Sequence, residues 1–112
     1  MSRPDADRLD DIASAITSIH SHLQHGPITV EIVMDAVAMR LLEIGEAVKG
    51  ISPELTATAP GIQWSDIAGM RDFLAHHYFA TNPDMIQLTI DKRLIPLAEA
   101  VERLKDHLPP EG

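Results

Sequence analysis

The sequence contains no cysteine and few aromatic residues. Without cysteine the chain has no disulfide bond, no zinc site built from thiolates and no cysteine nucleophile, and this agrees with a cytoplasmic protein. Aromatic residues make up 4% of the chain and hydrophobic residues 45%. The predicted core is therefore aliphatic, built from Leu, Ile, Val, Met and Ala side chains.

Long apolar runs and basic residues are also scarce. No apolar run approaches the roughly 20 residues that a membrane-spanning helix needs, and the first eight residues lack the apolar centre of a signal peptide. We therefore expect no membrane partner. The 9 basic and 17 acidic residues give a net charge of −8, which argues against broad, sequence-independent binding to nucleic acid. No DNA partner is expected, and an RNA substrate would need a few local cationic contacts.

The length of 112 residues predicts one domain, residues 1–112, with frayed ends at residues 1–4 and 109–112. Apolar residues recur every three or four positions, and no segment shows the alternation with a period of two that marks a strand. The spacing predicts long helices over about residues 5–25, 30–50, 64–78 and 83–108, with a short helix near residue 53. We therefore expect an all-α fold, an up-and-down bundle of four long helices plus one short helix.

The predicted second helix has two apolar sides. One side repeats at steps of four and three, as in a coiled coil; its members are Val30, Met34, Val37, Leu41, Ile44, Val48 and Ile51. The other side carries Ile32, Met39 and Leu42 and ends in Glu46. A helix that is apolar on two sides lies in the centre of its bundle or against another subunit. A carboxylate on such a side needs a cationic partner, for which we expect Arg71.

Capping residues and prolines predict where the helices begin and bend. Thr29 is the expected N-cap of the second helix. Asn82 is the expected N-cap of the last helix, with Pro83 at its first position. Pro96 removes one backbone donor inside this helix, which predicts a kink near residues 92–95.

Three histidines, His20, His22 and His25, invite interpretation as a metal site. Their spacing does not fit one helical face, because ligands on a helix usually sit three or four positions apart. We therefore expect no metal site and no cofactor. Four acidic residues near the N-terminus are expected to form a solvated face; they are Asp5, Asp7, Asp10 and Asp11.

The most informative stretch has the pattern R-x4-H-x-Y, formed by Arg71, His76 and Tyr78. Arg71 shares a helical face with the apolar residues Ile67 and Leu74. A guanidinium there is costly unless it is paired or lines a cleft. His76 lies roughly 140° further round an ideal helix. For both side chains to serve one small target, either the helix end distorts or two copies of the helix supply the site together.

Three segments resemble one family of small helical proteins. Residues 39–49 (MRLLEIGEAVK), 62–72 (IQWSDIAGMRD) and 74–79 (LAHHYF) are similar, in this order, to HepT-like toxins of the HEPN superfamily. The similarity covers about residues 9–104, nearly the whole chain. An arginine and a histidine at this spacing are weak evidence by themselves, but their combination with the tyrosine and the I-G-E-A and I-A-G-M-R-D runs is specific.

The resemblance implies a homodimeric helical toxin that cleaves RNA without a metal ion. The usual partner is a minimal nucleotidyltransferase antitoxin, which inactivates the toxin by transferring AMP from ATP to the motif tyrosine. Carried onto this sequence, Arg71 and His76 form the catalytic pair, and Tyr78 is the modified residue. His77 stands where relatives vary, so it receives no role.

The chemistry of metal-independent RNA cleavage suits these residue types. Histidine changes its protonation near neutral pH, and arginine supplies fixed positive charge for the phosphorane oxygens. A two-fold axis near this helix would gather two copies of Arg71 and His76 into one cleft. Gly69, Asp72 and His76 share the face opposite the core, where Gly69 would permit close approach. Glu46 and Asp72 are expected to support the pair.

Simpler interpretations stay open for each residue. Arg71 could be a structural arginine paired with Glu46, and His76 could be an exposed or capping histidine. Tyr78 lies on the core stripe by spacing, so packing alone could explain its ring, with the hydroxyl reaching solvent. The alternative function is a non-catalytic helical dimer that binds a nucleotidyltransferase. A plain helical scaffold is a third interpretation.

Overall fold

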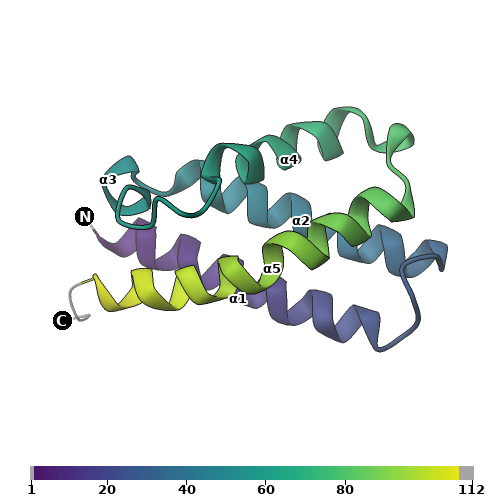
Figure 1. Ribbon diagram of the computed structural model, residues 1–112, viewed down its shortest axis with the longest axis horizontal. Helices are drawn as coiled ribbons and strands as arrows, with labels where there is room; N and C mark the ends of the chain where they lie inside the picture. Colours follow the sequence, from purple (N-terminus) through teal and green to yellow (C-terminus); the bar gives the residue numbers. More distant parts are fainter. Residues whose placement is uncertain (1, 109–112) are drawn as a thin grey trace.

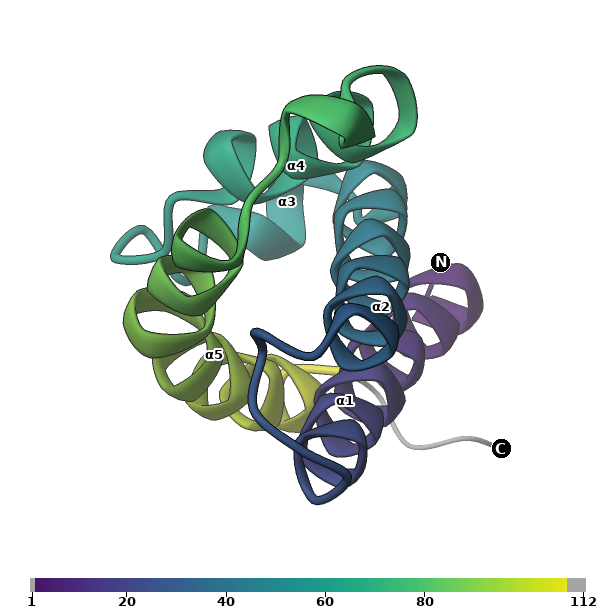
Figure 2. The ribbon, with the colours of Figure 1, turned by 90° about the vertical axis from the view of Figure 1, so that its right-hand side faces the viewer.

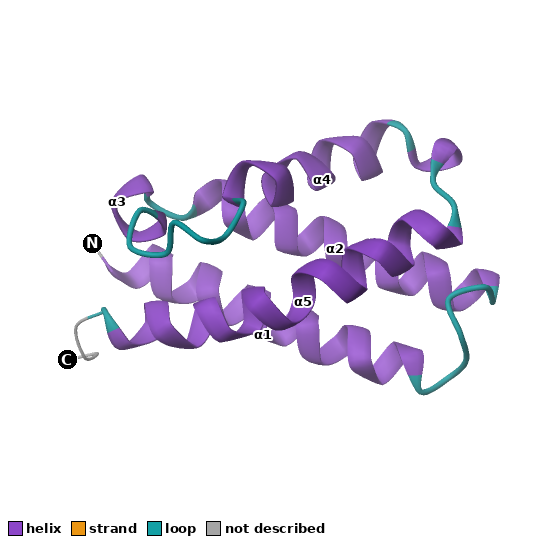
Figure 3. Ribbon diagram, viewed as in Figure 1, coloured by secondary structure: helices purple, strands orange, loops and turns teal. Residues whose placement is uncertain are grey.

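The computed structural model describes the backbone of residues 2–108 and the side chains of residues 5–108. The helices, in chain order, are α1 (Ser2–Leu23), α2 (Glu31–Gly50), α3 (Pro53–Thr56), α4 (Trp64–His76), the 3₁₀ helix η1 (Tyr78–Ala80) and α5 (Pro83–Asp106). No strand occurs in the described residues, so the predicted all-α class is confirmed (Figure 3). Of the expected frayed ends, Met1 and residues 109–112 lie outside the described residues, whereas residues 2–4 continue α1.

The four long helices run alternately in opposite directions along the bundle (Figure 1). α2 packs against both α1 and α4, and α5 packs mainly against α1. Viewed from the end, the long helices surround a common centre (Figure 2). This is the up-and-down bundle that the spacing of apolar residues predicts. In the part of the chain that the structure describes, no helix is both long enough and apolar enough to cross a membrane.

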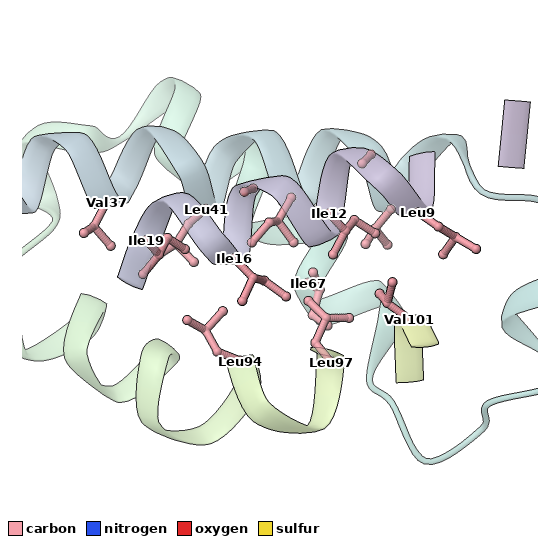
Figure 4. Packing of buried hydrophobic residues seen from close by; sticks show 14 of the residues in the cluster. Leu9, Ile12, Ile16, Ile19, Val37, Leu41, Ile67, Leu94, Leu97 and Val101 are labelled. Carbon is pink, nitrogen blue, oxygen red and sulfur yellow. The ribbon is translucent and has the colours of Figure 1, made fainter. Parts of the chain in front are cut away.

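The predicted apolar stripes form the core. Side chains from α1, α2 and α5 meet in the centre of the bundle (Figure 4). The buried apolar residues of these helices include Leu9, Ile12, Ile16, Ile19, Val37, Leu41, Ile44, Val48, Ile51, Ile86, Leu94, Leu97, Val101 and Leu104. Val30, the first member of the stripe predicted for the second helix, is instead 40% exposed. Ile67 and Leu74 are the buried residues of α4. The aliphatic core expected from the composition is therefore present.

The start of α5 agrees with the sequence, whereas α1, α4 and α5 each end two residues before the predicted position and α2 begins one residue later. The Asn82 side chain caps α5 by accepting a hydrogen bond from the N–H of Met85 at 3.0 Å. Thr29 is not a cap, because α2 begins one residue later with Val30 at the N-cap position. α5 continues through Pro96 and changes direction in its middle part (Figure 1). α4 ends at His76, two residues before the predicted end.

One acidic residue that was expected on a solvated face is buried. Asp5 is 6% exposed, and its carboxylate accepts hydrogen bonds from the Ser52 backbone N–H at 2.9 Å and the Ser52 hydroxyl at 2.7 Å. Ser52 is the N-cap of α3, where unpaired backbone donors favour a carboxylate. The hydrogen bonds of Asp5 thus connect α1 to the start of α3. Asp10 and Asp11 are exposed, as expected.

Candidate functional site

Arg71 lies at the edge of α4 that faces α2, and Glu46 of α2 holds its guanidinium. Arg71 Nε donates to Glu46 Oε1 at 2.9 Å, so the predicted ion pair is confirmed. Arg71 Nη1 also lies 3.4 Å from Asp72 Oδ1. The Arg71 side chain remains 34% exposed. The guanidinium is therefore held in one orientation while it stays open to solvent.

Lys49 extends this network beyond the residues predicted from the sequence. Its Nζ lies 3.2 Å from Asp72 Oδ1, the oxygen that also faces Arg71. The hydrogen bond and charge of Lys49 hold the pKa of the Asp72 carboxyl below its ordinary value, and Arg71 lowers it further although desolvation opposes this. Glu46 and Asp72 are each more than half exposed. Because exposed ion pairs add little stability, the main effect of the network is to orient Arg71.

Gly45 explains why α2 and α4 come so close at this point. A Cβ atom at Gly45 would lie 3.0 Å from the Ile67 carbonyl oxygen and closer still to Arg71. Only a residue without a side chain allows the two backbones this approach. Since Glu46 is the next residue of α2, the contact places its carboxylate beside the guanidinium.

His76 is the last residue of α4, and its side chain is exposed. His76 Nδ1 lies 3.0 Å from the backbone oxygen of Asp72. A carbonyl oxygen can only accept, so Nδ1 carries the proton of the neutral ring. The other ring nitrogen, Nε2, then has a free lone pair in the neutral form. That is the arrangement a general base needs.

The structure does not bring Arg71 and His76 together within one chain. α4 stays helical as far as His76, and the backbone departs from helical geometry only at His77, with φ −133° and ψ 30°. The two side chains therefore keep the roughly 140° separation of an ideal helix. No hydrogen bond joins them in the described part of the chain. The sequence leaves open either a distorted helix end or a site supplied by two copies of the helix. The first does not occur, because α4 is undistorted as far as His76.

Tyr78 lies in η1, immediately after α4, and is partly buried. Its ring packs against the core cluster. Its hydroxyl donates a hydrogen bond to Asp35 Oδ1 of α2. The ring packs as the simpler interpretation expects, and the hydroxyl has a partner that the sequence did not predict, an exposed carboxylate of α2.

Asp35 and Tyr78 border a shallow hollow of about 230 Å³. Its other lining residues are Ala38, Met39, Leu42 and Leu74. Burial raises the pKa of the Tyr78 phenol to about 12, with further contributions from the hydrogen bond and charge of Asp35 and the charge of Glu31. The phenol therefore stays protonated at neutral pH.

The second apolar side of α2 is exposed in the single chain. Ile32 is 76% exposed and Met39 48% exposed, while Leu42 is half-buried. By helical spacing these residues share one stripe with Asp35 and Glu46. The partners of Tyr78 and Arg71 thus lie on the same open side of α2. The single chain therefore leaves this side of α2 partly uncovered.

His20 and His22 lie in the last turn of α1, and His25 follows the helix. Within the described residues, no group of three His, Cys, Asp or Glu side chains is placed to hold a metal ion. His22 is half-buried and His25 is exposed.

Sequence reasoning missed three residues of this region: Asp35, Gly45 and Lys49. Asp35 and Lys49 contact the motif across 43 and 23 residues of sequence, a separation that helical periodicity alone does not bridge. Gly45 did carry a signal, because glycine inside a helix costs roughly 1 kcal/mol relative to alanine and so indicates a packing requirement.

Comparison with known proteins gives a consistent result. The family model described as "Ribonuclease HepT-like" matches residues 11–104. A protein of Thermococcus cleftensis named a probable ribonuclease HepT is 32% identical in an alignment of 115 residues, which covers 94% of this chain and 99% of that protein.

Two further relatives match over shorter segments. A protein of Caldanaerobacter subterraneus subsp. tengcongensis named a putative RNase is 40% identical over 73 residues, or 64% of this chain. Another, from Methanocaldococcus jannaschii and also named a putative RNase, is 38% identical over 72 residues, or 63% of this chain. The matched segments span 65% and 60% of these two relatives' own lengths, less than two thirds. No solved structure matches the chain.

Proposed function

The chain belongs to the HepT-like ribonuclease family of the HEPN superfamily, and we propose that it is a metal-independent ribonuclease, the toxin of a toxin–antitoxin system. The observation that carries this proposal is the held guanidinium of Arg71 on the same helix as an exposed imidazole, His76. The two side chains supply the fixed charge and the titratable group that phosphodiester cleavage needs. The names of the relatives agree with RNA as the substrate class.

In the proposed reaction the ribose 2′-hydroxyl attacks the adjacent phosphorus. His76 Nε2 takes the proton of this hydroxyl as the new P–O bond forms. Arg71 balances the negative charge of the phosphorane oxygens through the N–H groups that Glu46 and Asp72 do not engage. The bond to the 5′-oxygen of the next nucleotide then breaks, and that oxygen receives a proton from solvent. The products are a 2′,3′-cyclic phosphate and a 5′-hydroxyl.

We propose that the working site is shared by two copies of the chain. Within one copy Arg71 and His76 point in different directions, so a two-fold axis beside α4 would pair the guanidinium of each copy with the imidazole of the other. The exposed stripe of α2 supports this arrangement, since Ile32 and Met39 offer apolar area on the same side of α2 as Glu46, the partner of Arg71. Association of two copies would thus both cover the exposed apolar stripe and complete the catalytic site.

The proposed partner is a minimal nucleotidyltransferase antitoxin that transfers AMP from ATP to Tyr78. Two features support this role: Tyr78 is two residues beyond His76, and it is the one tyrosine of the chain. An AMP group there would add bulk and negative charge beside the imidazole, where an RNA phosphate must bind. Because cellular RNA and ATP are both cytoplasmic, the proposed system acts in the cytoplasm.

The net charge of −8 favours one alternative, a non-catalytic dimer that binds the nucleotidyltransferase. A broad basic surface for RNA is not expected at this charge. Cleavage of RNA by the purified chain in the presence of a metal chelator would separate the two functions. The ribonuclease proposal expects cleavage products, and the binding module expects intact RNA.

Growth of cells that express the chain tests the toxin role. The chain alone should inhibit growth, and co-expression of the nucleotidyltransferase should restore it. Unchanged growth with the chain alone, at an expression level confirmed by blotting, would contradict the toxin proposal.

A further inference from the structure

We infer that Asp35 is a catalytic residue for the modification of Tyr78. It orients the phenol and accepts its proton while the phenol oxygen bonds to the phosphorus of a nucleoside triphosphate. This inference rests on the proposed function, in which Tyr78 receives AMP, and it assigns a reactive role to a residue of α2 outside the R-x4-H-x-Y motif.

The hydrogen bond between the two residues defines the orientation of the phenol. Tyr78 Oη donates to Asp35 Oδ1, so its hydrogen points toward α2. The lone pairs of the oxygen then remain for an electrophile. The hollow beside them is lined mostly by the apolar residues Ala38, Met39, Leu42 and Leu74. Asp35 itself is exposed, so the reacting oxygen lies at a surface that a second protein can reach.

The raised pKa of Tyr78 makes a base necessary. Burial, the bond to Asp35 and the nearby charge of Glu31 raise the pKa of Tyr78 to about 12. At pH 7 only about one phenol in 10⁵ is then ionised. The nucleophile is therefore the neutral phenol, whose proton must leave as the new bond forms.

Asp35 is the group placed to receive that proton. Glu31 acts on the phenol through its charge. His76 and His77 precede Tyr78 in the chain, but in the described part of the chain no hydrogen bond joins either imidazole to the Tyr78 hydroxyl. Within the described residues, Asp35 alone accepts a hydrogen bond from Tyr78 Oη.

The proposed step is balanced with ATP as the co-reactant. Tyr78 Oη attacks the α-phosphorus of ATP, and a P–O bond to the phenol oxygen forms. The bond from the α-phosphorus to the bridging oxygen breaks, and pyrophosphate leaves with that electron pair. The phenol proton passes to the Asp35 carboxylate and then to solvent. Because the phenol oxygen becomes strongly acidic as it bonds to phosphorus, a carboxylate is a sufficient base.

The test uses the purified full chain, a purified minimal nucleotidyltransferase and ATP, with AMP addition followed by intact-mass spectrometry. Asp35→Asn keeps an oxygen that can accept the hydrogen bond of the Tyr78 hydroxyl, but it removes the carboxylate that acts as the base. We expect AMP addition to slow about 10²-fold in this variant and to accelerate more steeply with pH than in the wild type. Asp35→Glu should recover part of the rate. Glu31→Gln is the matched control, because it removes a charge without removing the hydrogen bond, and it should stay within a few-fold of the wild type.

Ultraviolet titration of the phenol supplies a readout that activity does not. Tyr78 is the one tyrosine of the chain, so the absorbance change reports this residue alone. In Asp35→Asn the midpoint should fall below 12 but stay above 10, because burial, the largest contribution to the raised pKa, remains. Circular dichroism should show an intact helical fold.

The outcomes distinguish this inference from the proposed function. The role of Asp35 would be overturned, and the modification of Tyr78 kept, if the Asp35→Asn variant is modified at the wild-type rate. Its pH profile would then be unchanged although the phenol midpoint is lowered. A wild-type chain that gains no AMP, or a Tyr78→Phe variant that gains the same mass, would overturn the modification of Tyr78 and this inference with it.

Discussion

Gly45 of α2 and Arg71 of α4 are in backbone contact. A Cβ atom at Gly45 would lie 2.8 Å from Arg71 Cβ and 2.9 Å from the Arg71 backbone nitrogen. Real Cβ atoms essentially never come this close to another heavy atom. The contact fixes the base of the Arg71 side chain, and the ion pair with Glu46 fixes its end. Together they determine where the guanidinium can meet a phosphate.

Gly45→Ala should therefore separate α2 from α4 and displace Arg71. Overpacking costs about 1–3 kcal/mol, and the higher helix propensity of alanine returns roughly 1 kcal/mol. We expect a lower free energy of unfolding by urea denaturation, together with slower RNA cleavage. Gly61→Ala is the control, since nothing lies within 4 Å of its Cβ position and its φ is not positive, and it should be neutral or slightly stabilising. Equal losses of stability in both variants would contradict the close contact.

Arg71→Ala and His76→Ala should each lower metal-free RNA cleavage by 10² or more. The chain offers matched controls for both. Arg93, like Arg71, is 34% exposed and faces a carboxylate, that of Asp66 at 3.5 Å. His107 is the C-cap of α5, one residue beyond the helix, and places Nδ1 2.9 Å from the backbone oxygen four residues before it. Arg93→Ala and His107→Ala should retain cleavage, and equal losses in controls and motif variants would remove the motif from the reaction.

Tyr78 should make the fold sensitive to alkaline pH. Its pKa is near 10 in the unfolded chain and is raised to about 12 in the folded chain by burial and by Asp35. The folded state holds this proton more tightly, so the associated stability is complete below pH 10 and is lost as the pH rises toward 12. Urea midpoints should fall more steeply between pH 10 and 12 in the wild type than in Tyr78→Phe. Parallel curves would show that the phenol is not perturbed by folding.

The exposed stripe of α2 should hold the two copies together. Met39→Asp places a charge on that stripe, so light scattering at micromolar concentration should show a monomer, and cleavage should fall with it. Leu88→Asp is the control on α5, where Leu88 is 56% exposed, and it should leave the dimer intact. A wild-type chain that is monomeric yet fully active would contradict the shared site.

The local pattern of apolar and capping residues predicts most of this fold. The apolar stripes of α1, α2 and α5 follow from residue spacing, and Asn82 with Pro83 marks the start of α5. The errors lie at helix ends, where competing caps differ by little free energy. Asp5 is the clearest case, since nothing in a row of acidic residues distinguishes the one that caps α3 through Ser52.

The candidate site was predictable to the extent that it lies on one short segment of the sequence. Arg71, His76 and Tyr78 are close in sequence, and the pairing of Arg71 with Glu46 follows from a charge placed on an apolar stripe. Asp35 was not predictable, because its contact with Tyr78 depends on how α4 ends and how η1 turns back toward α2. That geometry arises from packing rather than from residue spacing.

Cleavage by two purified heterodimers, each with a differently tagged copy of the chain, tests the shared site most directly. One heterodimer joins Arg71→Ala to His76→Ala, and the other joins the wild type to a chain with both substitutions. If each Arg71 serves the His76 of the other copy, the first heterodimer keeps one intact site and about half of the wild-type activity, while the second is inactive. The reverse result, activity in the second heterodimer and none in the first, would show that each copy carries a complete site by itself.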